Sequence, residues 1–408
     1  MNYDTLLDCA VMLGYKLAIS GAETYRIEES ISKILQAYEI NAEVFAIPNC
    51  IFVGITTQAG TSISRVKRIP FHGTDLHRVE KYSNLSRRIC TEKPDPEQLH
   101  TWIEETERSA RQYRFPVLLL ANFLVAFGFA FLFGGALIDA VCAGICALAV
   151  GFTTRAMEKL HANLFFNTLL CAALLALCAY LLSIAGIAKN SDTVIIGALM
   201  LLVPGLLITN AMRDIIFGDI TSGTNRIVQT LLVAAAIICG TGIAWNIIAL
   251  RFSMPEPNSL IEYHFLIQIL ASFIACLGCS LVFNIQGRGI VLCVLGGGIS
   301  WGVYWLASRL SGSIMFGYFC AGAVSALYSE IMARIRKYPA ISYLVISIMP
   351  MIPGAGVYYT TDYLMRGDMA SFAAKGTQTL AIAGIIAVSI LTVSTLVRLF
   401  SVWKNQKK

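Results

Sequence analysis

The dipeptide Pro204-Gly205 interrupts a long apolar run, and the same dipeptide interrupts a second apolar run at Pro353-Gly354. Two more pairs repeat at the same offset of 149 residues, Gly218-Asp219 with Gly367-Asp368 and Gln229-Thr230 with Gln378-Thr379. Six identities at one offset without a gap indicate an internal repeat. In a membrane protein, a proline-glycine pair within an apolar run is typical of a broken helix beside a polar site.

The composition is that of an integral membrane protein. Of the 408 residues, 56% are hydrophobic and 14% are charged, and the mean hydropathy is +0.67. Residues 1–114 hold 14 Lys/Arg and 15 Asp/Glu, whereas the other 294 residues hold 17 and 10. This split predicts a small soluble domain over 1–114, followed by a membrane domain. No basic cluster precedes an apolar core at the N-terminus, so the first domain is expected in the cytosol.

Ten apolar segments follow Arg114, most of them near the length that spans a bilayer. They lie at about 115–135, 137–152, 163–187, 193–209, 227–250, 264–283, 289–306, 313–331, 341–358 and 376–400. The sequence therefore predicts a polytopic α-helical membrane protein with one five-span repeat in 115–255 and another in 256–408. Because five is odd, the second repeat is expected to be inverted.

The positive charges agree with this topology. With the N- and C-termini in the cytosol, 26 of the 31 Lys and Arg residues lie on the cytosolic side, as the positive-inside rule requires. This bias also explains the net charge of +6. The first domain is nearly neutral, so no nucleic-acid partner is predicted.

Residues 1–114 have the pattern of an α+β domain. Helical spacing predicts helices over about 3–19, 27–38, 75–90 and 97–111, and strand-forming residues between 43 and 69 predict a three-stranded antiparallel sheet. A set of polar residues is a candidate ligand or regulatory site, or alternatively a set of helix caps and solvated side chains. The set is Glu23, Thr24, Arg26, Glu28, Arg65 and Arg68.

Two other sites in this domain are weakly supported. His72, Asp75 and His77 lack a further matching metal ligand, so neither a metal nor a cofactor is predicted. Ser20, His72 and Asp75 would suit a hydrolase, but the Gly-x-Ser-x-Gly turn is absent.

The two prolines predict polar backbone groups at membrane depth. Each removes an amide hydrogen, which would free the carbonyl of Met200 or Met349. The restarted helices would present amide hydrogens, which suit a carboxylate, while freed carbonyls suit an ammonium group. A zwitterionic amino acid meets both needs. A proline kink is the alternative for either break alone, and the repetition favours the binding site.

Residues near the breaks form the candidate transport path. The predicted substrate-binding residues are Met200, Pro204, Gly205, Thr209, Asn210, Gln229, Met349, Pro353, Gly354, Tyr358, Tyr359 and Gln378. Gating or structural roles are predicted for Asp219, Asp368, Arg213, Asp214, Arg288 and Asp362. Asp219 and Asp368 each follow a glycine and are expected to cap the next helix.

Asp139 is the candidate for proton coupling. It lies early in the second span among apolar residues, where an acid is costly unless it is paired or functional. An interfacial acid at the end of a span is the alternative. The offset of the repeat pairs Asp139 with Arg288 in the second copy. Cys276 and Cys279 form a CxxC spacing within a span and are read as packing residues.

Several motifs resemble those of the threonine/serine exporter family of bacterial inner-membrane proteins. They are Ser20-Gly21-Ala22-Glu23-Thr24-Tyr25-Arg26-Ile27-Glu28, Arg65-Val66-Lys67-Arg68, Leu85-Ser86-Arg87-Arg88, Phe133-Gly134-Gly135 with Asp139, and both Pro-Gly segments. The resemblance covers essentially the whole chain and implies the fused form, joined near Met254 to Asn258. It implies an antiporter that exports threonine or serine on the proton motive force, rather than an enzyme.

Other functions stay open at this stage. Some split members of the family are linked to dicarboxylate export, so the motifs do not fix the substrate. A first domain that hydrolyses a peptide or ester before export, a passive channel and a homo-oligomer are all compatible with the sequence. For an exporter, alternating access between the inverted repeats is the expected mechanism.

Overall fold

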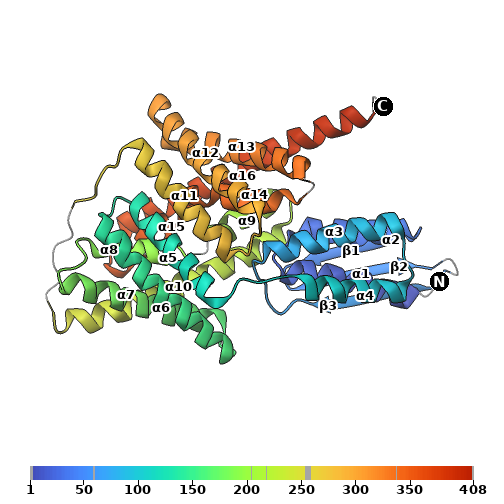
Figure 1. The fold of residues 1–408 in the computed structure, drawn as a ribbon, viewed down its shortest axis with the longest axis horizontal. Coiled ribbons are helices and arrows are strands. Elements are labelled where there is room, and N and C mark those ends of the chain that lie inside the picture. The colour runs from blue at the N-terminus through green and yellow to red at the C-terminus, as the bar shows by residue number, and fades with distance from the viewer. Residues whose placement is uncertain are drawn as a thin grey trace. The chain divides into compact units, whose positions relative to one another are not determined.

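A computed structural model describes residues 3–57, 60–203, 205–216, 218–252, 259–336 and 338–406 (Figure 1). The chain divides into two compact units. Unit 1 contains the chain up to Tyr113 together with Phe283–Gln286 and Arg336–Ser342. Unit 2 contains the remaining residues, which include the long apolar helices.

Unit 1 contains four helices and three strands in its described residues. They are α1 (Tyr3–Ile19), α2 (Thr24–Ala37), β1 (Ala42–Ile47), β2 (Cys50–Thr56), β3 (Ser62–Arg68), α3 (Leu76–Glu92) and α4 (Pro96–Ser109). The strands form an antiparallel sheet in the order β1-β2-β3, which confirms the predicted sheet. Alternate residues of β2, such as Ile51 and Val53, are buried, because successive side chains of a strand point to opposite faces.

Asp75 joins several parts of unit 1. Its Oδ1 atom caps α3 by accepting the Arg78 N–H at 3.0 Å, and it also accepts from Asn284 Nδ2 at 2.9 Å. The Leu76 N–H donates to the Phe283 carbonyl at 3.0 Å. These bonds hold Phe283–Gln286, the connection between two apolar helices, within unit 1.

Unit 2 consists of helices. They are α5 (Phe115–Leu132), α6 (Leu137–Lys159), α7 (Leu164–Ile184), α8 (Ser191–Leu199), α9 (Gly205–Ile216), α10 (Ile220–Ala249), α11 (Phe265–Val282), α12 (Arg288–Ser311), α13 (Ile314–Arg336), α14 (Ala340–Ile348), the 3-10 helix η1 (Met349–Met351), α15 (Gly354–Met365) and α16 (Met369–Gln406). The last residue of α13 and the first three residues of α14 belong to unit 1.

The described residues include eight helices that are long and apolar enough to cross a membrane: α5, α6, α7, α10, α11, α12, α13 and α16. A ninth crossing is present if Ala340–Met351 and Gly354–Leu364, which meet at a bend of 48°, form one span. The chain is therefore polytopic. A tenth crossing would need α8 and α9 to form one span across Pro204, which lies outside the described residues, so ten spans stay a prediction.

Helix boundaries repeat at the same offset as the sequence pairs. Ser191–Leu199 corresponds to Ala340–Ile348, and Gly205–Ile216 corresponds to Gly354–Met365. The next helices begin at Ile220 and Met369, which are separated by that offset as well. Packing follows the same pattern, since α9 and α15 each contact both α10 and α16. The sequence repeat is thus a repeat of helices and of helix contacts.

Glycines allow the two halves of unit 2 to approach closely along α5 and α11. A Cβ atom at Gly128 of α5 would lie 2.8 Å from the Ala275 Cα atom of α11, and one at Gly278 would lie 2.7 Å from the Val125 nitrogen. Small residues at such contacts are typical of helix packing in membranes. Any larger residue at either glycine would push the helices apart.

Candidate functional site

The two repeated breaks contact each other. Met200 forms the C-cap of α8, and Gly354 is the first residue of α15. A Cβ atom at Gly354 would lie 2.5 Å from the Met200 Sδ atom and 3.4 Å from Val203 Cγ1. A side chain at position 354 would therefore have to displace the flexible end of the Met200 side chain. Pro204 and the side-chain surroundings of Gly205 lie outside the described part of the chain.

The second break is a short 3-10 turn. Pro353 is buried and precedes α15 with φ −75° and ψ 50°. The Met349 carbonyl accepts the Ile352 N–H at 3.3 Å. The prediction that this carbonyl is freed is therefore wrong, because the tighter turn supplies a donor three residues later in place of the one that Pro353 removes.

Tyr358 of α15, in the second repeat, packs into the hydrophobic core of the first repeat. Its side chain is 7% exposed and packs in a hydrophobic cluster with residues of α6, α7 and α8, such as Ala176 and Ile195. The ring of Tyr359 lies next to it, with the two centroids 5.5 Å apart. The two predicted tyrosines thus lie on one helix beside the break.

A charged cluster adjoins these tyrosines. Arg366 Nε lies 2.9 Å from Asp362 Oδ2. Asp192, in the first turn of α8, interacts electrostatically with both, and Tyr180 of α7 interacts with the two aspartates. Sequence reasoning missed Asp192 and Tyr180. The sequence did contain a signal for Asp192, because an acidic residue stands directly before the apolar segment 193–209.

A second ion pair joins α9 and α10. Arg226 Nε lies 2.8 Å from Asp214 Oδ2, and their side chains are 17% and 13% exposed. Asp214 was predicted from the sequence, whereas its partner Arg226 was not. The side chain of Arg213 lies outside the described residues. A largely buried pair between consecutive helices restrains their relative movement, which suits a gate.

Asp219 and Asp368 serve as helix caps. Each accepts a backbone N–H three residues later, from Ser222 at 3.1 Å and from Ser371 at 3.0 Å. The glycines before them have φ of 94° and 74°, values that favour glycine. These two aspartates therefore start α10 and α16.

Asp139 is an anchor for backbone groups. Its side chain is 1% exposed, and its oxygens accept from Ala136 N at 3.0 Å, Lys189 N at 2.6 Å and Asn190 N at 3.2 Å. It therefore connects the start of α6 to the residues just before α8. Arg288, its partner by the repeat, is the first residue of α12.

The other predicted path residues are distributed along α9, α10 and α16. Thr209 is 2% exposed, and Asn210 and Gln229 are half-buried. Gln378 accepts from Lys375 Nζ at 3.2 Å. Contacts between these helices bring the elements together.

The polar residues predicted in the first domain are used in local contacts of unit 1. Glu28 Oε1 accepts the Ala46 N–H at 2.8 Å, and Arg65 binds Asp4 and Asp8 at 2.6 Å each. Burial acts to lower the pKa of Arg26, but the adjacent Glu23, 3.5 Å away, and other neighbours outweigh it, so the pKa is raised. Thr24 is the first residue of α2, and Arg68, the last of β3, is exposed.

The alternative sites in unit 1 have other hydrogen-bond partners. The Ser20 hydroxyl donates to the Lys16 carbonyl at 2.7 Å. The ring nitrogens of His72 lie near the carbonyls of Ala18 and Pro48. Ser20 and His72 thus both contact backbone carbonyl groups. The described residues contain no group of three or more His, Cys, Asp or Glu side chains placed to hold a metal ion.

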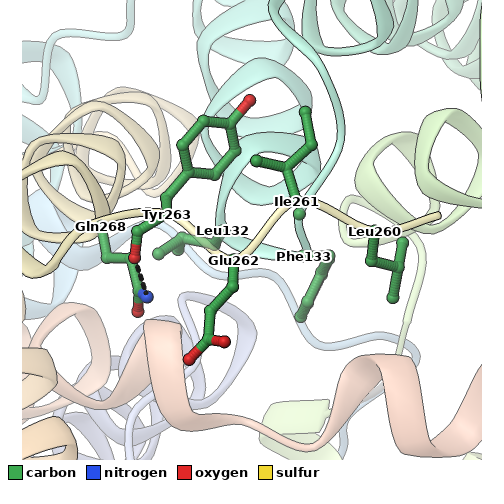
Figure 2. A pocket seen from close by; sticks show the side chains of 8 residues that line it. Leu132, Phe133, Leu260, Ile261, Glu262, Tyr263 and Gln268 are labelled. Carbon is green, nitrogen blue, oxygen red and sulfur yellow. Dashed lines mark hydrogen bonds between the residues drawn. The ribbon is translucent and has the colours of Figure 1, made fainter.

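A cavity lies between the end of α5 and the extended segment before α11. Its volume is about 290 Å³, and it is lined by Leu132, Phe133, Gly134, Leu260, Ile261, Glu262, Tyr263 and Gln268. Figure 2 shows Tyr263 and Ile261 projecting to one side of this segment and Glu262 to the other.

The segment that forms the cavity is fixed to the loop after α5. Tyr263 Oη donates to the Gly135 carbonyl at 2.9 Å, and the Ile261 N–H donates to the Gly134 carbonyl at 2.8 Å. A Cβ at Gly135 would lie 3.0 Å from Thr193 Oγ1 in α8. The loop after α5 therefore contacts both the segment that lines the cavity and the first turns of α8.

The long apolar helices and the paired breaks define the class of protein as a multi-pass α-helical membrane protein. A family model described as "Putative threonine/serine exporter" matches residues 8–248, and one described as "Threonine/Serine exporter, ThrE" matches residues 268–396. The chain belongs to the threonine/serine exporter family, which confirms the resemblance found in its motifs.

Relatives with curated names are distant but extensive. The chain is 23% identical over 402 residues to "Threonine/serine exporter" of Corynebacterium glutamicum, covering 96% of this chain and 80% of that protein. It is 22% identical over 367 residues to "Probable threonine/serine exporter" of Mycobacterium tuberculosis, covering 86% and 69%. A third relative, "Pheromone-regulated membrane protein 10" of Pichia sorbitophila, is 22% identical over 84% of this chain and 35% of its own length. No solved structure matches the chain significantly.

Proposed function

We propose that the protein is a secondary antiporter that exports small amino acids of the threonine/serine type in exchange for protons. The observation that carries the proposal is the contact between Met200 and Gly354, because it brings the two repeated breaks to one place. Relatives named threonine/serine exporter favour that substrate class over dicarboxylates.

The groups at this place suit a zwitterion. The first turn of α15 begins directly after Pro353 and has amide hydrogens that attract a carboxylate. The carboxylates of Asp192 and Asp362 attract an ammonium group, and Tyr358 and Tyr359 supply an apolar wall with hydroxyl groups. A small amino acid carries both of these charges.

The repeated arrangement of helices supports alternating access. If α8 and α9 form one broken span, as the 48° bend between the corresponding helices favours, each half has five crossings and the second half is inverted. The same helix contacts can then form around the site in two related ways, open to one side or to the other. The Asp214–Arg226 pair would close one side.

The composition of unit 1 supports a cytosolic first domain. The connections that contain Phe283–Gln286 and Arg336–Ser342 lie on the cytosolic side in the ten-span topology. Both belong to unit 1 together with the chain up to Tyr113. We therefore place this unit, and both termini, in the cytosol of a bacterial cell, with unit 2 in the inner membrane.

Proton coupling provides enough energy for export. One charge that crosses about 100 mV releases about 2.3 kcal/mol, and a tenfold gradient costs about 1.4 kcal/mol. One proton therefore sustains roughly a fiftyfold substrate gradient.

Transport by the purified full chain in liposomes tests the function. Labelled threonine, serine and succinate are supplied to separate samples, with and without an acidic lumen. We expect threonine or serine to accumulate against its gradient only when the lumen is acidic. Equilibration without accumulation would indicate a channel, and accumulation of succinate alone would indicate a dicarboxylate exporter.

A further inference from the structure

The charges beside the second break are not repeated in kind at the matching positions beside the first, although the helix boundaries repeat. At the offset of the repeat, Tyr180 corresponds to Ser329, Asp192 to Ile341, Tyr358 to Thr209, Asp362 to Arg213 and Arg366 to Phe217. The two repeats therefore form one acidic cluster, which contains Asp192 and Asp362, and not two. The two breaks therefore differ in the charges around them.

The cluster has one more carboxylate than Arg366 neutralises. Arg366 forms its ion pair with Asp362, and within the described residues no side chain forms a salt bridge to Asp192. Lys375 of α16 faces the Tyr359 ring, with Nζ 5.8 Å from the centroid.

Other groups near Asp192 do not neutralise it. Tyr180, Tyr358 and Tyr359 are the tyrosines in electrostatic contact with it. Asp139 of α6 binds the backbone at Lys189 and Asn190, just before α8. Asp192, Asp362 and Arg366 together carry one net negative charge, which one monovalent cation would neutralise.

We propose that Asp192 binds the coupling proton, and that this proton and the ammonium group of the substrate occupy the Asp192–Asp362 pair in turn. The inference rests on the proposed function, whose substrate is a zwitterion. A proton from the outer solution bonds to an Asp192 carboxylate oxygen, and the substrate leaves with its ammonium group intact. On the cytosolic side the proton departs to water, and the next ammonium group takes its place.

The position of Asp192 favours this exchange over a purely structural task. An acid in the first turn of α8 also stabilises the helix, but that task requires no contact with another half of the molecule. Asp192 instead belongs to α8, which contacts α15, and it interacts electrostatically with Asp362 and Arg366 of α15, the helix that begins at the break in contact with Met200. A change of charge at Asp192 therefore acts directly on α15, which would move during alternating access.

The test compares full-length wild type, Asp192→Asn and Asp368→Asn in liposomes. Asp368 is an exposed cap that asparagine can also form, so it controls for the same chemical change. Exchange of labelled for unlabelled threonine at equal pH measures substrate binding and movement. Accumulation into an acidic lumen measures coupling, and a pH-sensitive dye measures proton release when threonine is added to the purified protein.

We expect Asp192→Asn to show weakened exchange, because the ammonium group keeps only the Asp362 carboxylate, and to lose accumulation at least tenfold more than exchange, with no proton release. Asp368→Asn should behave as wild type in all three measurements. The proposal is overturned if Asp192→Asn loses accumulation only in proportion to its loss of exchange, or if threonine still causes proton release from it. Absence of threonine and serine exchange by wild type would instead refute the proposed function.

A second variant covers the case in which asparagine prevents folding. Asp192→Glu keeps the titratable group, so it should still accumulate threonine, with an altered pH profile. If Asp192→Glu folds but fails to accumulate threonine while exchange persists, a carboxylate at this position does not suffice and the assignment is wrong.

Discussion

Gly354 presents no side chain to Met200, and a single added methyl group would lie 2.5 Å from the Met200 Sδ atom. The two residues belong to different copies of the repeat, so their contact fixes the distance between the two breaks. An overpacked site of this kind costs roughly 1–3 kcal/mol. The contact yields the first prediction.

Gly354→Ala should reduce threonine transport severalfold, because the added methyl group must displace the Met200 side chain from the contact between the two breaks. Gly384→Ala is the matched control, since a Cβ there would meet its nearest neighbour, Met212 Cε, at an ordinary 3.6 Å. The double variant Gly354→Ala/Met200→Ala should recover part of the activity. Failure of the double variant to improve on the single one would refute the steric explanation.

Asp139→Asn should destabilise the protein rather than uncouple it. The amide would place an NH2 group against backbone N–H donors that now bind a carboxylate, and bonds of this charged kind contribute about 1.5–3 kcal/mol each. We expect a lower melting temperature, with exchange and accumulation reduced in parallel. A selective loss of accumulation would support the alternative prediction that Asp139 carries the coupling proton.

Asp214→Asn should leave Arg226 largely buried without its ion-pair partner. Removal of one partner from a buried pair costs about 3–5 kcal/mol, measured as the loss in unfolding free energy. Asp214→Asn/Arg226→Gln should recover part of this loss. Glu29→Gln provides a control, because the Lys33–Glu29 pair is exposed and such pairs contribute about 0–1 kcal/mol. Equal effects of the two single variants would contradict the assigned burial.

His77 should make unit 1 less stable in mild acid. Burial, with a smaller effect of Lys81, lowers the pKa of His77, while Asp75 acts against the shift. The unfolded chain therefore takes up this proton first as the pH falls through about 6.5, and stability is lost below that pH.

The measurement is limited proteolysis of the full chain between pH 8 and pH 5, with cleavage scored in the part of unit 1 that ends at Tyr113. His77→Gln should flatten the increase in cleavage rate with falling pH. His100→Gln is the control, since His100 is exposed. An unchanged pH profile in His77→Gln would show that another group governs the acid response.

Much of the local structure follows from residue order. The pattern of residues 3–68 predicted the first helix and the antiparallel sheet, since both depend on spacing and turn residues. The Gly-Asp pairs predicted two helix starts, because glycine permits the turn and the aspartate accepts a nearby N–H. The bond from Ile352 to the Met349 carbonyl was not predicted, because a proline excludes one donor but does not specify its replacement.

The sequence by itself determined that the chain is a membrane protein in which a Pro-Gly pair interrupts an apolar run twice, because apolar length, charge bias and the Pro-Gly pairs are properties of adjacent residues. Only the tertiary structure decided which distant groups meet. It placed Met200 against Gly354, gave Asp139 three backbone donors, and brought Asp192 and Tyr180 to Asp362. These contacts join segments that lie far apart in the chain, and they depend on how helices pack rather than on the pattern along any one of them.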